Sequence, residues 1–276
     1  MARRRHSSSR RRRDKDSFPW VLAVLFGIGV LAVVCGFGWL VFQANSNRVH
    51  LAEDLCRTTG PMEQTIVLVD ATDPISPLTQ KEILTRLADQ AAAVPTNGRF
   101  ELRTLETGQS RTNKIFSLCN PGSGAEIDGL IGNPAAAQRR WQGSFAEPLE
   151  EAMRRVVTGS AGDTSPIMAA LQEIAVDHLT SQAERAIPTR IIVISDMTEN
   201  TPDFTMYAPG GPSIEVYRTS RAATAYAVDL AGATVDIWYL RRDNSPASVG
   251  LMNFWAEWIS INRGRGGTAI ALQGLQ

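Results

Sequence analysis

The hydrophobic residues of this chain form one long uninterrupted block near the amino terminus, followed by shorter blocks with strand and helix periods. The first block, WVLAVLFGIGVLAVVCGFGWLVF, runs from Trp20 to Phe42 without a charged residue. At about 1.5 Å per residue, a helix of this length crosses a hydrocarbon core of roughly 30 Å. Residues 20–42 are therefore predicted to form a transmembrane helix.

The charges that flank this block predict its orientation in the membrane. Residues 1–16 hold eight Arg and Lys against two Asp, whereas Arg48 alone follows soon after the block. Because such a positive excess stays in the cytoplasm, residues 1–19 are expected to form a basic cytoplasmic tail. Residues 43–60 are expected to form a polar stalk, and the rest of the chain is expected to lie outside the membrane.

Other interpretations of the amino terminus are weaker. The sequence QANS after the block suits cleavage of a secretory signal, but the block is longer than the apolar region of a signal peptide. A lipid attached at Cys35 would need a small residue before the cysteine, where Val34 stands. The basic run could contact nucleic acid, but its position favours a role in topology and attraction to anionic lipid. We therefore expect the membrane, and no nucleic acid, as the partner of this region.

Residue usage predicts the compartment. Only three of the 28 basic residues are Lys, a bias that hints at a GC-rich bacterial genome. We expect a single-pass protein of a bacterial inner membrane with a periplasmic carboxyl-terminal domain. Cys56 and Cys119 both fall on the periplasmic side, where a disulfide persists. Such a bond would stabilise the fold by roughly 4 kcal/mol in the chain-entropy model.

Beyond the stalk, apolar strand-like runs alternate with helical patterns. The predicted strands are residues 65–72, 100–107, 190–198 and 233–240. The predicted helices are residues 78–94, 145–157, 165–179, 219–231 and 248–262. Ser165 and Pro166 are the expected N-cap and first helical residue of the third helix. Residues 108–143 are expected to be a long irregular stretch, and residues 263–276 a carboxyl-terminal tail.

This alternation predicts one α/β domain over residues 61–262, with a doubly wound, mostly parallel sheet covered by helices on both faces. In such sheets, ligands collect at the carboxyl ends of the strands. Asp70 and Asp196 each end an apolar predicted strand, TIVLVD and RIIVISD. Their side chains converge only if the two strands are neighbours, which the order of elements allows.

The two strand-ending aspartates, with a hydroxyl-bearing helix start between them, resemble the von Willebrand factor type A (vWA-like) domain. That family has a doubly wound α/β fold and a metal-ion-dependent adhesion site. The site is built from an Asp-x-Ser-x-Ser loop, a Thr or Ser that begins a middle helix, and a later Asp. Here the three elements correspond to DATDP at 70–74, GDTSPIMAAL at 162–171 and VISDM at 193–197. The spacing in the second element favours Ser165 over Thr164.

One position departs from the family's pattern, because Pro74 stands at the second serine and offers no side-chain ligand. Mg²⁺ prefers six oxygen ligands and fills gaps with water. The ligands that the resemblance implies are Asp70, Thr72, Ser165 and Asp196, with Thr164, Asp73 and Ser76 as substitutes. The alternative is a decayed site whose residues serve structure alone. In that case Asp70 accepts turn amides, Ser165 caps a helix and Asp196 closes a loop.

The resemblance implies a binding function, since in that family an acidic residue of a partner protein completes the coordination of the bound ion. We therefore expect a membrane-anchored, extracytoplasmic module that binds an unidentified protein of the cell envelope, with Mg²⁺ as its cofactor if the site is intact. Catalysis is not expected.

A phosphohydrolase is the alternative function. A strand that ends in Asp-x-Thr also resembles the haloacid-dehalogenase-like phosphotransferases, in which Asp70 would be the nucleophile and Asp196 a metal ligand. Most members carry a second aspartate where Thr72 stands. That family also uses a lysine to balance phosphate charge. Besides Lys81 in the first predicted helix, only Lys114 lies between the two aspartates, and it falls in the predicted irregular stretch. We therefore rank this function second.

Overall fold

The chain divides into two compact units, Met1–His50 and Leu51–Gln276, which we describe separately. The computed structural model describes residues 18–46, 51–70, 72, 74–105, 111–127, 132–157, 164–209, 211–241 and 248–272.

The first unit contains helix α1 (Phe18–Ser46). Its segment Trp20–Leu40 has a mean hydropathy of 2.6 and is long and apolar enough to cross a membrane. No other helix among the described residues meets this test. The apolar helix predicted from the sequence is therefore confirmed, and it fits a single-pass membrane protein.

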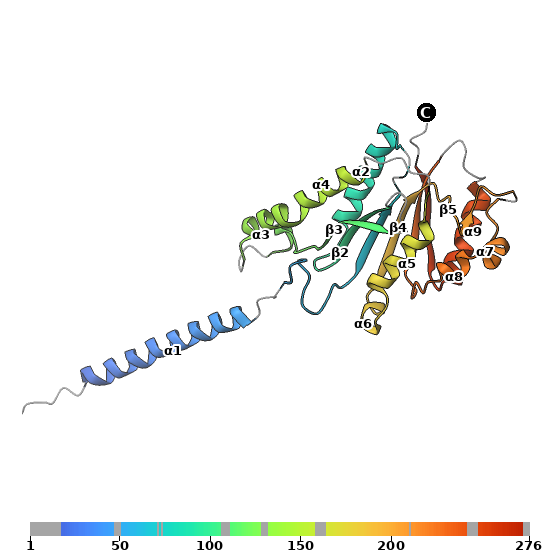
Figure 1. Cartoon of the computed structure of the whole chain (residues 1–276). Helices are drawn as coiled ribbons and strands as arrows, with labels where there is room; N and C mark the ends of the chain where they lie inside the picture. The colour runs from blue at the N-terminus through green and yellow to red at the C-terminus, as the bar shows by residue number, and fades with distance from the viewer. Residues whose placement is uncertain are drawn as a thin grey trace, which may run out of the picture. The chain divides into compact units, whose positions relative to one another are not determined.

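The second unit is built on a six-stranded sheet in the order β3-β2-β1-β4-β7-β8 (Figure 1). All neighbouring strands are parallel except β2 and β3. The strands are β1 (Gln64–Val69), β2 (Arg99–Leu105), β3 (Thr112–Cys119), β4 (Thr189–Ser195), β7 (Thr234–Leu240) and β8 (Arg265–Leu272). A separate hairpin pairs β5 (Asn200–Thr201) with β6 (Phe204–Thr205). The predicted α/β fold with a mostly parallel sheet is confirmed.

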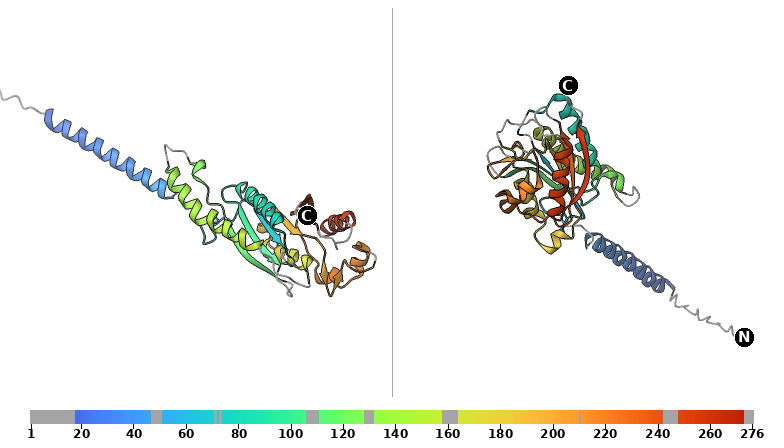
Figure 2. Two further views of the ribbon diagram at one scale, coloured as in Figure 1. Left: turned by 90° about the horizontal axis from the view of Figure 1, so that it is seen from above. Right: turned by 90° about the vertical axis from the view of Figure 1, so that its right-hand side faces the viewer.

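Helices cover both faces of the sheet (Figure 1, Figure 2). On one face lie α2 (Pro77–Ala92) and α4 (Glu147–Val156). The other face is covered by α5 (Ile167–His178), α7 (Ile214–Thr219), α8 (Ala222–Ala225) and α9 (Ser248–Ile261). The remaining short elements are η1 (Gly124–Glu126), α3 (Pro134–Trp141), the π-helical segment η2 (Gln142–Ala146) and α6 (Gln182–Arg185).

The central strands are apolar throughout because both of their faces are buried. In β1, Val67 and Val69 pack under α2 and α4, whereas Ile66 and Leu68 pack under α5 and α9. Each fully buried aliphatic side chain of this kind contributes about 1.5–3 kcal/mol. Strands buried on both faces are the expected consequence of a parallel sheet between two helical layers.

The stretch 108–143, predicted to be irregular, contains regular structure instead. It holds β3, η1 and α3, and η2 joins α3 to α4 without a break. The strand escaped prediction because β3 lies at the edge of the sheet, where much of its surface is exposed. Its sequence TNKIFSLC therefore lacks the apolar run that marks the central strands.

Two other predictions differ from the structure. The single helix expected at 219–231 is instead the pair α7 and α8, because Ser220 adopts an extended conformation that ends α7. The segment 263–276, expected to be a tail, contains the edge strand β8. Most side chains of β8 are exposed, so this strand has no apolar pattern either.

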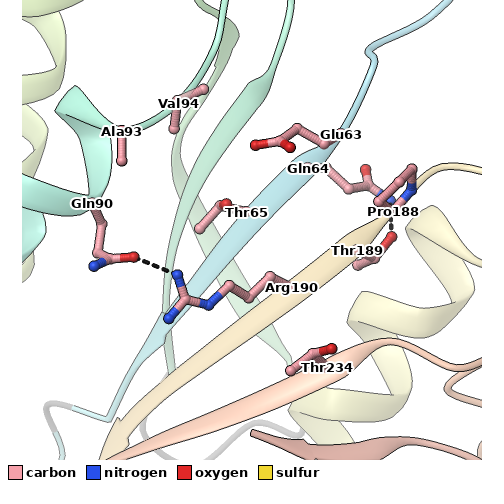
Figure 3. A pocket seen from close by; sticks show the side chains of 10 residues that line it. All are labelled: Glu63, Gln64, Thr65, Gln90, Ala93, Val94, Pro188, Thr189, Arg190 and Thr234. Atoms are coloured by element: carbon pink, nitrogen blue, oxygen red, sulfur yellow. Dashed lines mark hydrogen bonds between the residues drawn. The ribbon is translucent and has the colours of Figure 1, made fainter. Parts of the chain in front are cut away.

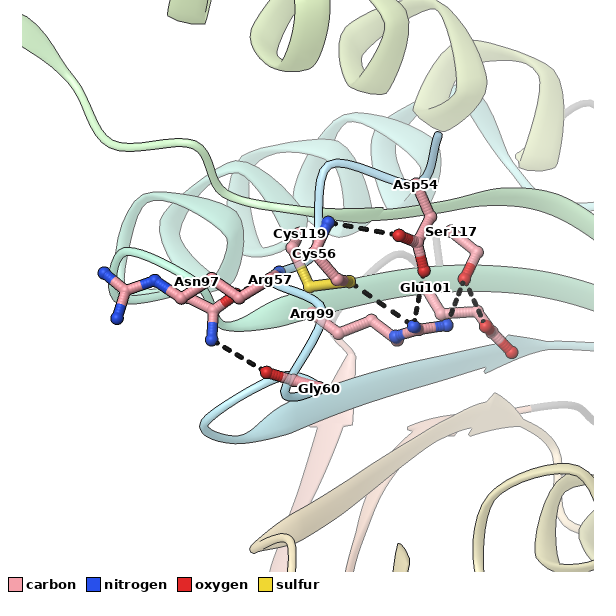
Figure 4. Close-up of a disulfide and its surroundings, with 9 residues drawn as sticks. All are labelled: Asp54, Cys56, Arg57, Gly60, Asn97, Arg99, Glu101, Ser117 and Cys119. Atoms are coloured by element: carbon pink, nitrogen blue, oxygen red, sulfur yellow. Dashed lines mark hydrogen bonds and ion pairs between the residues drawn. A yellow bond between two sulfur atoms is a disulfide. The ribbon is translucent and has the colours of Figure 1, made fainter. Parts of the chain in front are cut away.

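A disulfide joins Cys56 to Cys119, the last residue of β3, with 4.8 Å between their Cα atoms (Figure 4). The predicted pairing is confirmed. Arg99 supports the bond, since its Nη2 donates to Asp54 Oδ2 at 2.7 Å and to Cys56 Sγ at 3.3 Å. The disulfide thus fastens the beginning of the second unit to an edge strand.

Residues 51–60 belong to this unit, although we expected them to be part of a stalk. The backbone N–H of Arg57 donates to Asn97 Oδ1 at 2.9 Å, and Asn97 Nδ2 donates to the carbonyl oxygen of Gly60 at 3.0 Å (Figure 4). These contacts are made by polar groups and a disulfide, so no hydrophobic pattern in the sequence indicates them.

Removing the disulfide is expected to destabilise the second unit. The double variant Cys56→Ser/Cys119→Ser should lose about 2–4 kcal/mol of unfolding free energy, because the unfolded chain gains conformational freedom. Urea denaturation of the full chain in detergent, followed by tryptophan fluorescence, measures this loss. Cys35→Ser is the matched control, since Cys35 is a free thiol in α1. Equal midpoints for the double variant and the control would contradict a structural role for the bond.

Candidate functional site

The two strand-ending aspartates lie on neighbouring strand ends. β1 and β4 are parallel partners, with Val69 opposite Ile194, and the backbone N–H of Asp70 donates to the carbonyl oxygen of Ile194 at 2.8 Å. Because the chain adds β2 on one side of β1 and β4 on the other, this is the switch point of the sheet. Asp70 and Asp196 therefore share the carboxyl edge at the place where open α/β sheets bind ligands.

The Asp70 carboxylate accepts hydroxyl groups from three separate segments. Ser165 Oγ and Ser195 Oγ each donate to Oδ2 at 2.7 Å. Thr72 Oγ1 donates to Oδ1 at 2.7 Å, and the backbone N–H of Thr72 donates to the same oxygen at 3.2 Å. Asp70 is only 1% exposed. These four bonds satisfy a buried charge that would otherwise destabilise the fold.

Ser165 does not cap α5, in contrast to our prediction. The N-cap position belongs to Pro166, whose side chain makes no capping bond. The backbone N–H and carbonyl of Ser165 instead pair with those of Asn200, at 3.2 Å each. This short antiparallel bridge directs the hydroxyl of Ser165 to Asp70, so tertiary pairing overrides the local capping preference.

Glu199 takes over the capping role, and sequence reasoning missed it. Its Oε2 accepts the backbone N–H of Met168 at 2.9 Å, whereas Oε1 is buried without a partner among the described residues. Burial raises the pKa of Glu199 to about 8, although backbone hydrogen bonds from Met168 and Ile167 oppose the rise. The negative charge of Asp70 raises this pKa further. The only sequence signal is a charged residue within the polar stretch that follows Asp196.

The loop after β4 is held from several directions. Asp196 is buried, and its Oδ1 accepts the backbone N–H of Thr198 at 2.9 Å. The backbone N–H of Met197 donates to Ser195 Oγ at 2.8 Å, and Trp255 Nε1 donates to the carbonyl of Met197 at 2.7 Å. Ser195 therefore joins the site as a second residue that sequence reasoning left out of the ligand set.

The three residues predicted as substitute ligands are not seen to donate a hydrogen bond to Asp70. Ser76 caps α2, accepting the backbone N–H of Thr79 at 3.2 Å. Thr164 is half-buried, and no hydrogen bond joins it to Asp70. Asp73 lies outside the described residues.

The chemistry of the cluster suits a hard cation. Carboxylate and hydroxyl oxygens are the ligands that Mg²⁺ prefers. Each hydroxyl donates its one proton to Asp70. Thr72 and Ser165 keep their oxygen lone pairs for a cation, whereas Ser195 Oγ uses one lone pair to accept the backbone N–H of Met197. The described residues contain no group of three or more His, Cys, Asp or Glu that could hold a metal. A cation at this edge would therefore depend on hydroxyl oxygens in addition to the two carboxylates.

A second polar cluster occupies the opposite end of α5. Lys114 Nζ lies 3.9 Å from Glu101 Oε2 and 3.8 Å from Asp177 Oδ2, and His178 Nε2 lies 3.0 Å from Glu101 Oε1. Burial alone would raise the pKa of Glu101, but the hydrogen bond with His178 and nearby positive charge lower it to about 2. Because α5 is about 18 Å long, Lys114 lies far from Asp70. The lysine required by the phosphotransferase interpretation is thus engaged elsewhere.

Comparison with known proteins yields similarity of fold alone. No protein-family model and no curated protein matches this chain. The fold is similar to the conserved hypothetical protein BatB from Bacteroides thetaiotaomicron, with 13% identity and a TM-score of 0.41 over 77% of this chain and 91% of that one. It is also similar to an aerotolerance-related membrane protein from Bacteroides fragilis carrying multiple mutations to serine, with 15% identity and a TM-score of 0.36 over 76% and 92%. Neither description names an enzymatic activity.

The raised pKa of Glu199 predicts a specific pH dependence of stability. The pKa rises from 4.5 to about 8 on folding, so the folded chain holds this proton more tightly than the unfolded chain. The resulting stabilisation is complete below the unfolded pKa and is lost as the pH rises through the folded pKa. Glu199→Gln cannot ionise, so its melting temperature should fall less than that of the wild type between about pH 5 and pH 9.

Thermal unfolding of the full chain across this pH range provides the measurement. The matched control is Glu150→Gln, which removes an exposed carboxyl group from α4. Its melting curve should keep the pH dependence of the wild type. If Glu199→Gln also keeps it, Glu199 does not titrate in this range.

Proposed function

We propose that this chain is a membrane-anchored binding module that docks another protein at the carboxyl edge of its sheet. The observation that carries the proposal is the buried Asp70 carboxylate, which gathers hydroxyl groups from three segments at the switch point. Asp70, Thr72, Ser165 and Asp196 would hold a Mg²⁺ ion there, as the vWA resemblance implies. The bound ion would supply a positive charge, and an acidic side chain of the partner would complete its coordination.

Exposed apolar side chains on the connections at this edge support a protein partner. Leu78, Tyr207 and Val249 follow β1, β4 and β7, respectively, and are 63%, 55% and 72% exposed. Connections that leave the carboxyl ends of parallel strands lie at the same edge of the sheet. Large apolar residues near a polar centre are the usual composition of a protein interface.

The engagement of Asp70 disfavours catalysis by this residue. A nucleophile must reach its substrate, whereas the Asp70 carboxylate is buried and accepts four hydrogen bonds. His178, a candidate general base, belongs to the cluster at the opposite end of α5. A binding role therefore fits this geometry better than phosphoryl transfer does.

The disulfide supports an extracytoplasmic location for the second unit. Structural disulfides persist in oxidising compartments such as the bacterial periplasm. Together with the basic residues before α1, the Cys56–Cys119 bond favours a cytoplasmic amino terminus and a periplasmic domain in a bacterial inner membrane.

Titration with Mg²⁺ tests the binding site. The full chain in detergent is first treated with a chelator. Added Mg²⁺ should then raise its melting temperature, because a concentration 100-fold above Kd increases the free energy of unfolding by about 2.7 kcal/mol. Ser165→Ala and Thr72→Val each remove one ligand oxygen and should reduce this gain. Thr85→Val removes an exposed hydroxyl from α2 and is the matched control.

The variants separate a metal site from a purely structural cluster. If Mg²⁺ leaves the wild-type melting temperature unchanged while Asp70→Asn lowers it, the hydroxyl groups serve the fold alone. Turnover of a phosphatase substrate that disappears in Asp70→Asn would instead favour the enzyme.

Thiol labelling tests the proposed orientation. In a Cys35→Ser background, a membrane-impermeant maleimide should label Thr85→Cys in bacterial spheroplasts. Ser8→Cys should be labelled only after the cells are permeabilised, because the basic tail is expected in the cytoplasm. The reverse pattern would rule out a periplasmic domain.

A further inference from the structure

A pocket of about 270 Å³ lies at the amino ends of β1, β4 and β7, at the edge of the sheet opposite Asp70 (Figure 3). It lies beyond the end of α2 at Ala92 and is lined by the first residues of the strands. Ala93 and Val94 form the helix side of the pocket, and Pro188 lies on the strand side. This pocket plays no part in the site described above.

A row of polar side chains crosses the floor of the pocket. Thr65 pairs in register with Arg190, which pairs with Thr234 on the next strand. Neighbouring strands lie about 4.8 Å apart, so these three side chains stand side by side on one face. Glu63 precedes Thr65 by two residues and therefore points to the same face. The hydroxyls of Thr65 and Thr234 make no hydrogen bond to the other described residues.

The guanidinium of Arg190 is fixed in position but is not fully used. Its Nε donates to Asp236. Its Nη1 donates to Gln90 Oε1 at 2.6 Å (Figure 3). Asp236 is 2% exposed, and its other oxygen accepts the backbone N–H of Thr268. Among the described residues, nothing accepts a hydrogen bond from Nη2. These two bonds hold the guanidinium in place, and its Nη2 can donate a charge-assisted hydrogen bond to a ligand carboxylate.

Glu63 supplies the complementary charge. Its carboxylate is half-buried, and no described residue forms a hydrogen bond or ion pair with it. Since Asp236 already balances Arg190, the carboxylate of Glu63 leaves the pocket with an excess negative charge. A simple anion is therefore disfavoured, and a simple cation would leave Arg190 Nη2 unused. A ligand that carries both charges can pair with Arg190 and Glu63 at once.

We propose that this pocket binds a small amino-acid-like zwitterion, whose carboxylate pairs with Arg190 and whose ammonium group pairs with Glu63. The volume of about 270 Å³ admits a molecule of amino-acid size. The threonine hydroxyls provide further hydrogen bonds to the ligand carboxylate. Binding here is independent of the function proposed for the carboxyl edge.

Isothermal titration of the full chain in detergent tests this proposal, with alanine and lysine as the two probes. Propionate and ethylammonium carry one of the two charges each and serve as matched ligands. At least one amino acid should bind about tenfold or more tightly than either single-charge compound. Glu63→Gln should weaken that binding by about tenfold or more, because it removes a charge-assisted hydrogen bond.

Control variants show whether a loss of binding comes from the pocket or from unfolding of the variant protein. Glu63→Gln should keep the wild-type melting temperature without ligand, since the Glu63 carboxylate has no partner to lose among the described residues. Glu147→Gln, which changes an exposed carboxyl group on α4, should bind like the wild type. Ala93→Phe would fill the pocket from its exposed rim and should abolish binding without altering either charge.

Three results would overturn the proposal. One is the absence of a binding signal for both amino acids at roughly 10 mM, above the millimolar range of weak ligands. Another is equal binding of alanine and propionate. The third is unchanged amino-acid affinity in both Glu63→Gln and Ala93→Phe.

Discussion

The burial of the Asp70 carboxylate is the constraint on which the architecture of the carboxyl edge depends. An isolated charge at 1% exposure would strongly destabilise the fold. Hydroxyl groups of Thr72, Ser165 and Ser195 make this burial tolerable, and each belongs to a different segment. The same bonds that satisfy the charge therefore fix the loop after β1, the approach to α5 and the end of β4. One side chain thus determines how three connections of the fold meet.

Helix α5 links this edge to a second polar centre. Glu199 caps its beginning, whereas His178 at its end contacts the buried Glu101 of β2. The face between the two centres is apolar and packs on β1 and β4. The two carboxyl groups have opposite environments, since burial raises the pKa of Glu199 and a neighbouring histidine lowers that of Glu101. Placing these polar groups at the two ends leaves the middle of the helix free for close packing.

The parts of the fold that follow from hydrophobic burial could be predicted, and the parts that follow from polar pairing could not. TIVLVD and RIIVISD identify β1 and β4 because strands buried on both faces must be apolar. The aspartate that ends each of these apolar runs stands out in the sequence, and it indicated the candidate site. The edge strands β3 and β8 are exposed and lack that signal. Ser165 has the local character of a helix cap, and only its bridge to Asn200 reveals a different role.

The disulfide has a mechanical consequence for a domain attached to a membrane helix. Any pull on the chain from residue 50 enters the second unit through Leu51 to Cys56, and there it meets a covalent bond to the end of β3. The disulfide and the backbone that continues to β1 then share this tension. The central strand, whose end positions Asp70, therefore carries only part of the load.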